Sequence, residues 1–191
     1  MEKGNNMEKG TFLLKELFDT ALTYKDLQLS TSAYKSLLVN DKYDIPKKSV
    51  LELMHWAKRE KIDFGPYKDL TFFEISNRIY SDLVLLKAAD ILFKEHEIKS
   101  IRLNMSNHSG NDLYVTDKNN DGIVGEAFNA AESFFQIKMR SELKKFSSGR
   151  GVIAFNECAL NDKNRVFLER KKKDYKDVLF IECSLNEMPE I

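Results

Sequence analysis

Two acidic residues, Asp112 and Glu126, lie in neighbouring short runs of β-forming residues. Asp112 opens the run 112–116, and Glu126 lies within the run 123–128. If the two runs pair as a hairpin, both side chains can project from the same face of the sheet. Two such carboxylates suit Mg²⁺, which prefers oxygen ligands and keeps several waters that a substrate phosphate can displace. The pair therefore predicts a magnesium site.

The same pair has a plainer interpretation. An acid on each strand of a hairpin also occurs in proteins that bind no metal, where both carboxylates are solvated or one of them meets a lysine. The elements that surround Asp112 and Glu126 have to distinguish the two interpretations.

The pattern of apolar residues predicts a mixed α/β fold for residues 71–191. Helical spacing runs from residue 71 to about 97 and returns from 131 to 146. Short runs rich in β-branched and aromatic residues predict the strands, which are 100–105, 112–116, 123–128, 151–155 and 178–183. The first three should form an antiparallel meander, because only the short turn-rich segments SNHSGN and DKNNDG separate them. The charged segment 163–175 is predicted to be a helix or a loop.

The turn-rich segment DKNNDG also matches half of a calcium-binding loop. Residues 117–122, with the sequence DKNNDG, have the alternating oxygen ligands and the glycine of an EF-hand. The twelfth position is Phe128 where that loop needs glutamate, and the flanking residues are predicted strands. We interpret the segment as a hairpin turn.

This order of elements resembles the PD-(D/E)XK nuclease superfamily over residues 71–184. The resemblance is carried by Gly110-Asn111-Asp112 at the start of the second strand and by Gly125-Glu126 in the third. It implies a restriction-endonuclease-like α/β core in which Asp112 and Glu126 bind Mg²⁺. It also implies hydrolysis of phosphodiester bonds in DNA, most like a restriction endonuclease or a related defence or repair enzyme.

The chain departs from the motif of that superfamily at the lysine. Asn111 replaces the usual proline, and Phe128 stands where the lysine that helps to position or activate the attacking water is expected. In some members the lysine has moved to the following helix, and Lys138 is the candidate for that role here. Gln136-Ile-Lys138 could itself be aligned with a variant of the motif, which makes Gln136 a further candidate. The helical spacing of residues 134–146 favours Glu126 as the strand residue.

The resemblance also implies an acid on the first helix of the core. Glu74 and Asp82 are both available, and the distance to the first strand favours Asp82. Residues 1–70 are predicted to be a helical extension, with helical spacing over residues 12–22 and again over 50–57. The extension would serve target recognition or dimerisation, since small enzymes of this superfamily often act as homodimers that cut both strands.

The overall composition constrains the partners and the location. Lysine plus arginine equal aspartate plus glutamate at 30 each, so a nucleic acid has to meet a local patch. Residues 138–176 contain twelve basic and five acidic residues, which form either a track for the backbone of double-stranded DNA or a solvated face. Short apolar runs and a polar start predict a cytoplasmic protein without a membrane partner. Cys158 and Cys183 are expected to be buried or half-buried thiols.

Two other functions compete with the nuclease. The absent strand lysine at Phe128 favours a nuclease-like fold that has lost catalysis and binds DNA or protein. The third alternative, a small domain without any nucleic-acid role, predicts no DNA binding even at low salt.

Overall fold

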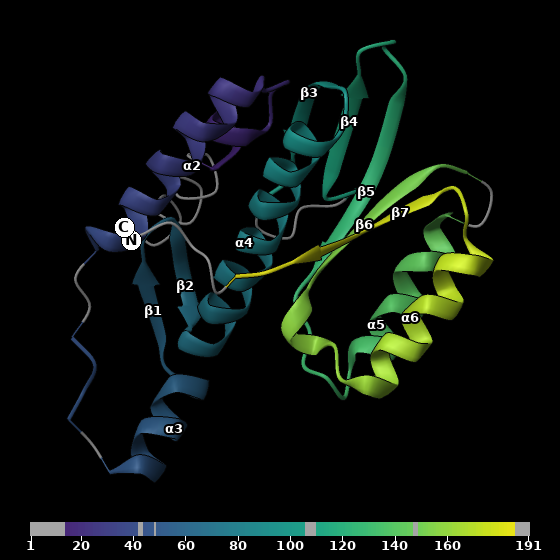
Figure 1. Ribbon diagram of the computed structural model, residues 1–191. Coiled ribbons are helices and arrows are strands. Elements are labelled where there is room, and N and C mark those ends of the chain that lie inside the picture. The colour runs from purple at the N-terminus through teal and green to yellow at the C-terminus, as the bar shows by residue number, and fades with distance from the viewer. Residues whose placement is uncertain (1–13, 42–43, 48, 106–109, 147–148, 186–191) are drawn as a thin grey trace.

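The computed structural model describes residues 14–41, 44–47, 49–105, 110–146 and 149–185. It confirms a mixed α/β fold, with a five-stranded sheet that has helices on both faces (Figure 1). On one face lies α4 (Phe72–Glu95), together with the N-terminal elements. The other face is covered by α5 (Phe135–Leu143) and α6 (Asp162–Asp174). The protein is therefore layered, and the sheet separates two hydrophobic cores.

The five strands lie in the sheet in the order in which they occur along the chain. They are β3 (Ile98–Leu103), β4 (Leu113–Asp117), β5 (Gly122–Phe128), β6 (Gly151–Asn156) and β7 (Val178–Cys183). The pairs β3–β4 and β4–β5 are antiparallel, which confirms the predicted meander, whereas β5–β6 and β6–β7 are parallel. The parallel pairs follow from the helical crossovers, because α5 and α6 return the chain to the same end of the sheet.

Helix α4 is the central helix, as its wide apolar face predicts. The Thr71 hydroxyl and Glu74 form a capping box at its start, with the Thr71 backbone N–H donating to Glu74 at 2.8 Å. The helix lies between the five-stranded sheet and a small hairpin of β1 (Lys61–Phe64) and β2 (Tyr67–Thr71) (Figure 1). Burial on both sides explains why apolar residues are spread around the helix.

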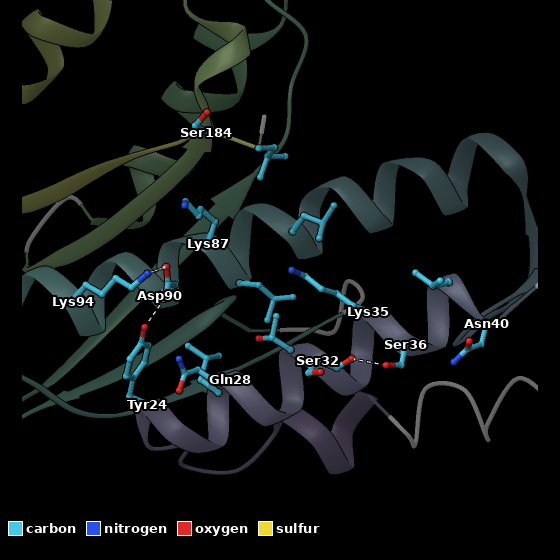
Figure 2. Close-up of a pocket in the computed structure, with 16 residues that line it drawn as sticks. Tyr24, Gln28, Ser32, Lys35, Ser36, Asn40, Lys87, Asp90, Lys94 and Ser184 are labelled. Carbon is cyan, nitrogen blue, oxygen red and sulfur yellow. Dashed lines mark hydrogen bonds and ion pairs between the residues drawn. The ribbon is translucent and has the colours of Figure 1, made fainter. Parts of the chain in front are cut away.

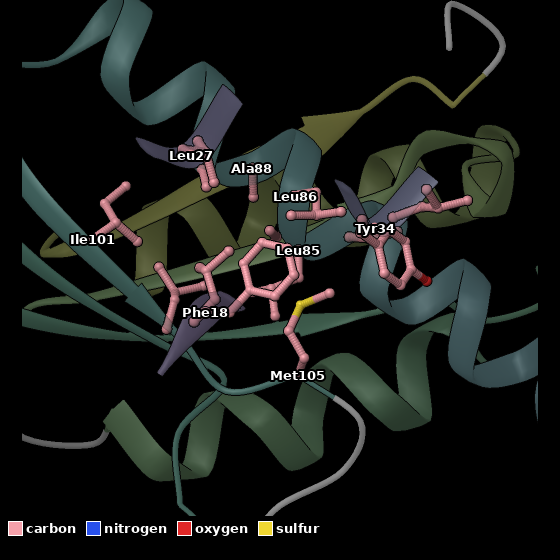
Figure 3. Packing of buried hydrophobic residues seen from close by; sticks show 14 of the residues in the cluster. Phe18, Leu27, Tyr34, Leu85, Leu86, Ala88, Ile101 and Met105 are labelled. Atoms are coloured by element: carbon pink, nitrogen blue, oxygen red, sulfur yellow. The ribbon is translucent and has the colours of Figure 1, made fainter. Parts of the chain in front are cut away.

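The N-terminal elements pack into the same core as α4. They are a helical stretch at residues 14–18, then α2 (Tyr24–Val39) and α3 (Val50–Arg59). Figure 3 shows Phe18 and Tyr34 in one hydrophobic cluster with Leu85 of α4, Ile101 of β3 and Met105. Leu22 forms a bridge with Ile101 through two backbone hydrogen bonds of 2.8 and 2.9 Å, which partly covers the edge strand β3. The predicted helical spacing begins at residues 12 and 13, which lie outside the described residues.

The hairpin between β4 and β5 confirms the interpretation of DKNNDG as a turn. One oxygen of Asp117 accepts hydrogen bonds from the backbone N–H groups of Asn119 and Asp121, at 2.8 and 2.9 Å. Asn120 has a φ of 66°, a left-handed conformation that asparagine tolerates better than most residues. The Asp117 carboxylate thus stabilises the turn by bonding the backbone N–H groups of the residues that follow it.

Two sequence expectations need correction. Residues 1–70 are predicted to be a helical extension, but they also contain strand β1 and most of β2, which Gly65-Pro66 connects into a hairpin. Cys183 is buried as expected, whereas Cys158 is exposed. None of the described helices combines the length and the apolarity that crossing a membrane requires.

Candidate functional site

Asp112 and Glu126 lie side by side on the face of the sheet that α5 covers. Leu113 pairs with Gly125, so the antiparallel register places Asp112 opposite Glu126. The Asp112 carboxylate also accepts a hydrogen bond of 2.8 Å from the backbone N–H of Ala127. The predicted proximity of the two carboxylates is thus produced by strand pairing alone.

Gly125 allows the strands to close around this pair. A Cβ atom at Gly125 would lie 2.8 Å from the Leu113 side chain and 2.9 Å from both the Cβ and the carbonyl oxygen of Val152. These distances are below any normal contact, and all three atoms belong to the strands on either side of β5, Leu113 to β4 and Val152 to β6. Glycine is therefore required beside Glu126 to keep the three strands in register.

The two carboxylates connect to a charged network on α5 and the turn after it. Lys145 donates a hydrogen bond of 2.7 Å to Glu126 and lies 2.6 Å from an oxygen of Glu142. The other Glu142 oxygen pairs with Lys138 at 2.6 Å. Glu126 and Glu142 are almost fully buried, while about half of the Lys145 side chain is exposed, at 47%. Solvent can therefore reach the network from the side of Lys145.

Burial raises the pKa values of the paired carboxyls. For Glu126, loss of solvation raises the pKa to about 7, and the hydrogen bond from Lys145 only partly opposes this, while the charge of Asp112 adds to it. For Asp112, burial again raises the pKa, and the hydrogen bond from Ala127 opposes it. Burial also acts on Glu142, but there the hydrogen bonds from Lys138 and Lys145 outweigh it and lower the pKa. The site is thus short of positive charge next to Asp112 and Glu126.

This arrangement predicts a pH-dependent gain in stability for Glu126→Gln in the metal-free protein. The pKa of Glu126 is about 7 in the folded protein and 4.5 is its ordinary value, so the folded state binds this proton more tightly. The stability that this bound proton contributes is complete below pH 4.5 and is lost as the pH rises through 7. Glutamine carries no such charge, so we expect the variant to be more stable than wild type by about 1–3 kcal/mol at pH 8.

Chemical denaturation in the presence of a chelator, at pH 5 and at pH 8, measures this effect. The gain should nearly vanish at pH 5, where the folded wild type already carries the proton. A gain of the same size at both pH values, or a loss at pH 8, would contradict the assignment of the buried charge to Glu126.

The oxygen atoms of this network fit a hard divalent cation. The second carboxylate oxygen of Glu126, Oε1, is buried and accepts no hydrogen bond within the described part of the chain, and only a protonated Glu126 can donate one to Asp112. Unpaired buried carboxylate oxygens are uncommon, and a cation would satisfy this one. Among the described residues, no three histidine, cysteine or acidic side chains form a ready-made metal site. Mg²⁺ does not need one, since it commonly binds through one or two carboxylates and several waters.

Phe128, which stands at the position of the superfamily's lysine, is a core residue. It is buried, and its ring centroid lies 6.0 Å from that of Phe135 and 5.9 Å from that of Phe155. It points to the same face as Glu126 but contributes to the core between the sheet and α5. Any cationic group for the site must therefore come from another element, and Lys145 supplies it.

The other predicted site residues lie in different environments. Lys138 reaches the network, but through Glu142 rather than Glu126. Gln136 bonds to Asn164 at 3.0 Å and to Arg140 at 3.1 Å, which links α5 to α6. Asp82 accepts a hydrogen bond of 2.6 Å from Tyr67 on the opposite face of the sheet.

The alternative first-helix acid, Glu74, belongs to a helix cap. It accepts hydrogen bonds from the backbone N–H and the hydroxyl of Thr71, and these bonds lower its pKa. Neither Glu74 nor Asp82 shares a hydrogen bond or an ion pair with Asp112 or Glu126 in the contacts of the described residues.

Glu142 and Lys145 are the site residues that the sequence analysis missed. A signal for them exists, because Glu142 lies four residues after Lys138 and three before Lys145, so all three share one helix face. Glu142 also falls within the buried apolar stripe that contains Met139 and Phe146. An acid within such a stripe, between two lysines, indicates a buried ion pair.

The basic stretch 138–176 divides into two parts. Lys138 and Lys145 contact the carboxylate network, whereas several basic residues of α6 pair with acids next to them. Examples are Lys171 with Asp174 at 2.7 Å and Lys172 with Glu169 at 3.0 Å. The basic residues of α5 and the turn after it therefore lie nearer to Asp112 and Glu126 than those of α6.

Comparisons of the chain with models of protein families, with curated proteins and with solved structures found no match in any of the three.

Proposed function

We propose that this protein is a Mg²⁺-dependent DNA endonuclease of the PD-(D/E)XK type, in which Lys145 replaces the strand lysine. The observation that carries the proposal is the contact of 2.7 Å between Lys145 and Glu126, directly opposite Asp112. It supplies the two carboxylates and one lysine that such a site needs, although Phe128 occupies the usual lysine position.

The arrangement of elements supports the proposal. A long helix precedes three antiparallel strands, and a helix then leads to a fourth strand that is parallel to the third. This is the order that a restriction-endonuclease-like core requires, and the two carboxylates lie on the strands where that core would carry them. The likeness is one of topology and of the positions of two acids, and a plasmid cleavage assay tests whether it extends to nuclease activity.

Each residue of the network has a chemical task in this proposal. Asp112 and the free oxygen of Glu126 would hold Mg²⁺, which lowers the pKa of a bound water and stabilises charge on the phosphate. The Lys145 ammonium, half exposed at the mouth of the site, would bind the scissile phosphate and orient the water. Glu142 holds Lys145 at that position through their ion pair of 2.6 Å.

The surroundings of the site suit an anionic polymer. Lys138 and Lys145 share one face of α5 and the turn after it, whereas Arg140 lies over the Phe167 ring of α6; all three side chains, and that of Lys144, are exposed. Phosphate contacts dominate the affinity of proteins for nucleic acids, so these basic residues around the site would bind the DNA backbone. A homodimer would place two such sites on one duplex, and the N-terminal elements would provide the dimer contact or the recognition of the target.

Incubation with supercoiled plasmid tests the proposal. Wild-type protein is expected to convert the plasmid to nicked and linear forms in Mg²⁺ or Mn²⁺ and to leave it intact in a chelator. The enzyme proposal would be wrong if no condition of metal and pH gave any nicking.

A DNA-binding module without catalysis is the alternative, and the burial of Phe128 in the core favours it. In that case the protein would shift DNA in a binding assay at low salt without cleaving it in any metal. Replacing Arg140 and Lys144 by glutamine would weaken that shift.

A further inference from the structure

A cavity between α2 and α4 lies on the face of the sheet opposite the carboxylate network (Figure 2). Its volume is about 690 Å³, within the usual range of small-molecule sites. Buried leucines form its apolar part, namely Leu27 from α2 and Leu83 and Leu86 from α4. Thr31 and Ser32 also line it from α2. An apolar floor with a few polar groups at the rim is typical of a ligand site.

Two lysines face this cavity without a counter-charge. Lys35 extends from α2 toward α4, whereas Lys87 points from α4 toward Ser184 at the end of the sheet; both line the cavity and are half-buried (Figure 2). Neither has an ion pair or a hydrogen bond with any other described residue. Long basic side chains usually reach full solvent or an acid, so two half-buried lysines at one cavity favour an anion.

The acid that lines the cavity is already neutralised. Asp90 accepts a hydrogen bond of 3.0 Å from Tyr24 and forms an ion pair of 2.7 Å with Lys94. Of the three lysines and one aspartate that line the cavity, Lys35 and Lys87 are left uncompensated. The cavity therefore has an apolar interior and a positive rim.

We propose that this cavity binds a small carboxylate with an apolar body, with the carboxylate at the positive rim that Lys35 and Lys87 form and the alkyl or aryl group against the leucines. The lysines select a negative charge, and the leucines select an apolar group that must leave water. A purely polar anion such as inorganic phosphate would gain nothing from the leucines. An uncharged alcohol of the same length would leave both lysines unpaired.

Calorimetric titration with octanoate, and with 1-octanol as its uncharged counterpart, tests the proposal on the full chain. Octanoate is expected to bind saturably below millimolar concentration and more tightly than octanol. Replacing either Lys35 or Lys87 by methionine removes one charged hydrogen bond but keeps the apolar stem, and should weaken octanoate binding about tenfold. Octanol binding should change little in these variants.

Two further variants control this experiment. Lys25→Met removes an exposed charge from the same helix and should leave the affinity for octanoate unchanged. Thr31→Trp fills the cavity and should abolish the binding of both ligands, with circular dichroism to check the fold. Unchanged octanoate affinity in the Lys35→Met and Lys87→Met double variant, equal affinity for octanol, or no saturable binding of octanoate would each overturn the proposal.

Discussion

Replacing Asp112 by asparagine is expected to reduce the nicking of supercoiled plasmid in Mg²⁺ by about 10³-fold or more, because metal stabilisation of transition-state charge contributes several kcal/mol. Asparagine has the same shape and can still accept the hydrogen bond of 2.8 Å from Ala127, so the hairpin should remain folded. The amide lacks the negative charge that holds the cation. Initial nicking rates of wild type and variant measure the effect.

Glu126→Ala should give a loss of similar size, since Glu126 provides the second carboxylate. Glu97→Gln is the matched control, because Glu97 forms an exposed ion pair with Lys118 away from the site and should nick at the rate of wild type. If Asp112→Asn and Glu126→Ala both cut as fast as the control, the nuclease site would not be where we place it.

Replacing Lys145 by methionine is expected to lower the nicking rate by about 10²–10³-fold, the usual effect of removing one preorganised charge from a reacting centre. The lysine contacts both Glu126 and Glu142, so its loss also leaves the buried Glu126 without a cation, whereas Glu142 keeps its ion pair with Lys138. Lys145→Arg keeps the charge and should retain more activity than the methionine variant. The comparison of the two variants separates the role of the charge from that of the exact ammonium position.

Lys138→Met provides the decisive control for this assignment. Lys138 pairs with Glu142 alone in the described contacts, so its removal should lower the rate by about tenfold, the low end for groups that act through another residue and less than the effect of Lys145→Met. The opposite order, with Lys138→Met inactive and Lys145→Met active, would return the catalytic role to Lys138.

Most of the fold could be predicted because its signals are local. The strands around Asp112 and Glu126 are short, rich in β-branched residues and separated by Asn/Asp/Gly turns, and α4 has a long helical period. The β1–β2 hairpin could not be predicted in this way. Its strands contain four and five residues, and such a hairpin is marginal unless it packs on another element, here α4.

The candidate site shows the same division between local and distant information. The pairing of Asp112 with Glu126 follows from the register of one hairpin. The contact between Lys145 and Glu126 depends on how α5 packs on the sheet, and the spacing of residues within α5 does not determine that packing. Asp82 shows the converse, because its position on the first helix matched the resemblance while its hydrogen bond leads to Tyr67.

Binding of Mn²⁺ by the metal-free protein tests the central claim most directly. Titration at pH 8, followed by the electron paramagnetic resonance signal of free Mn²⁺, should show saturable binding to the wild type, and weaker binding at pH 6, where protons compete for Glu126, whose pKa is about 7. The double variant Asp112→Asn and Glu126→Gln should bind no Mn²⁺ while remaining folded. A wild type that binds none, or a double variant that binds as tightly as wild type, would contradict a metal site at this hairpin.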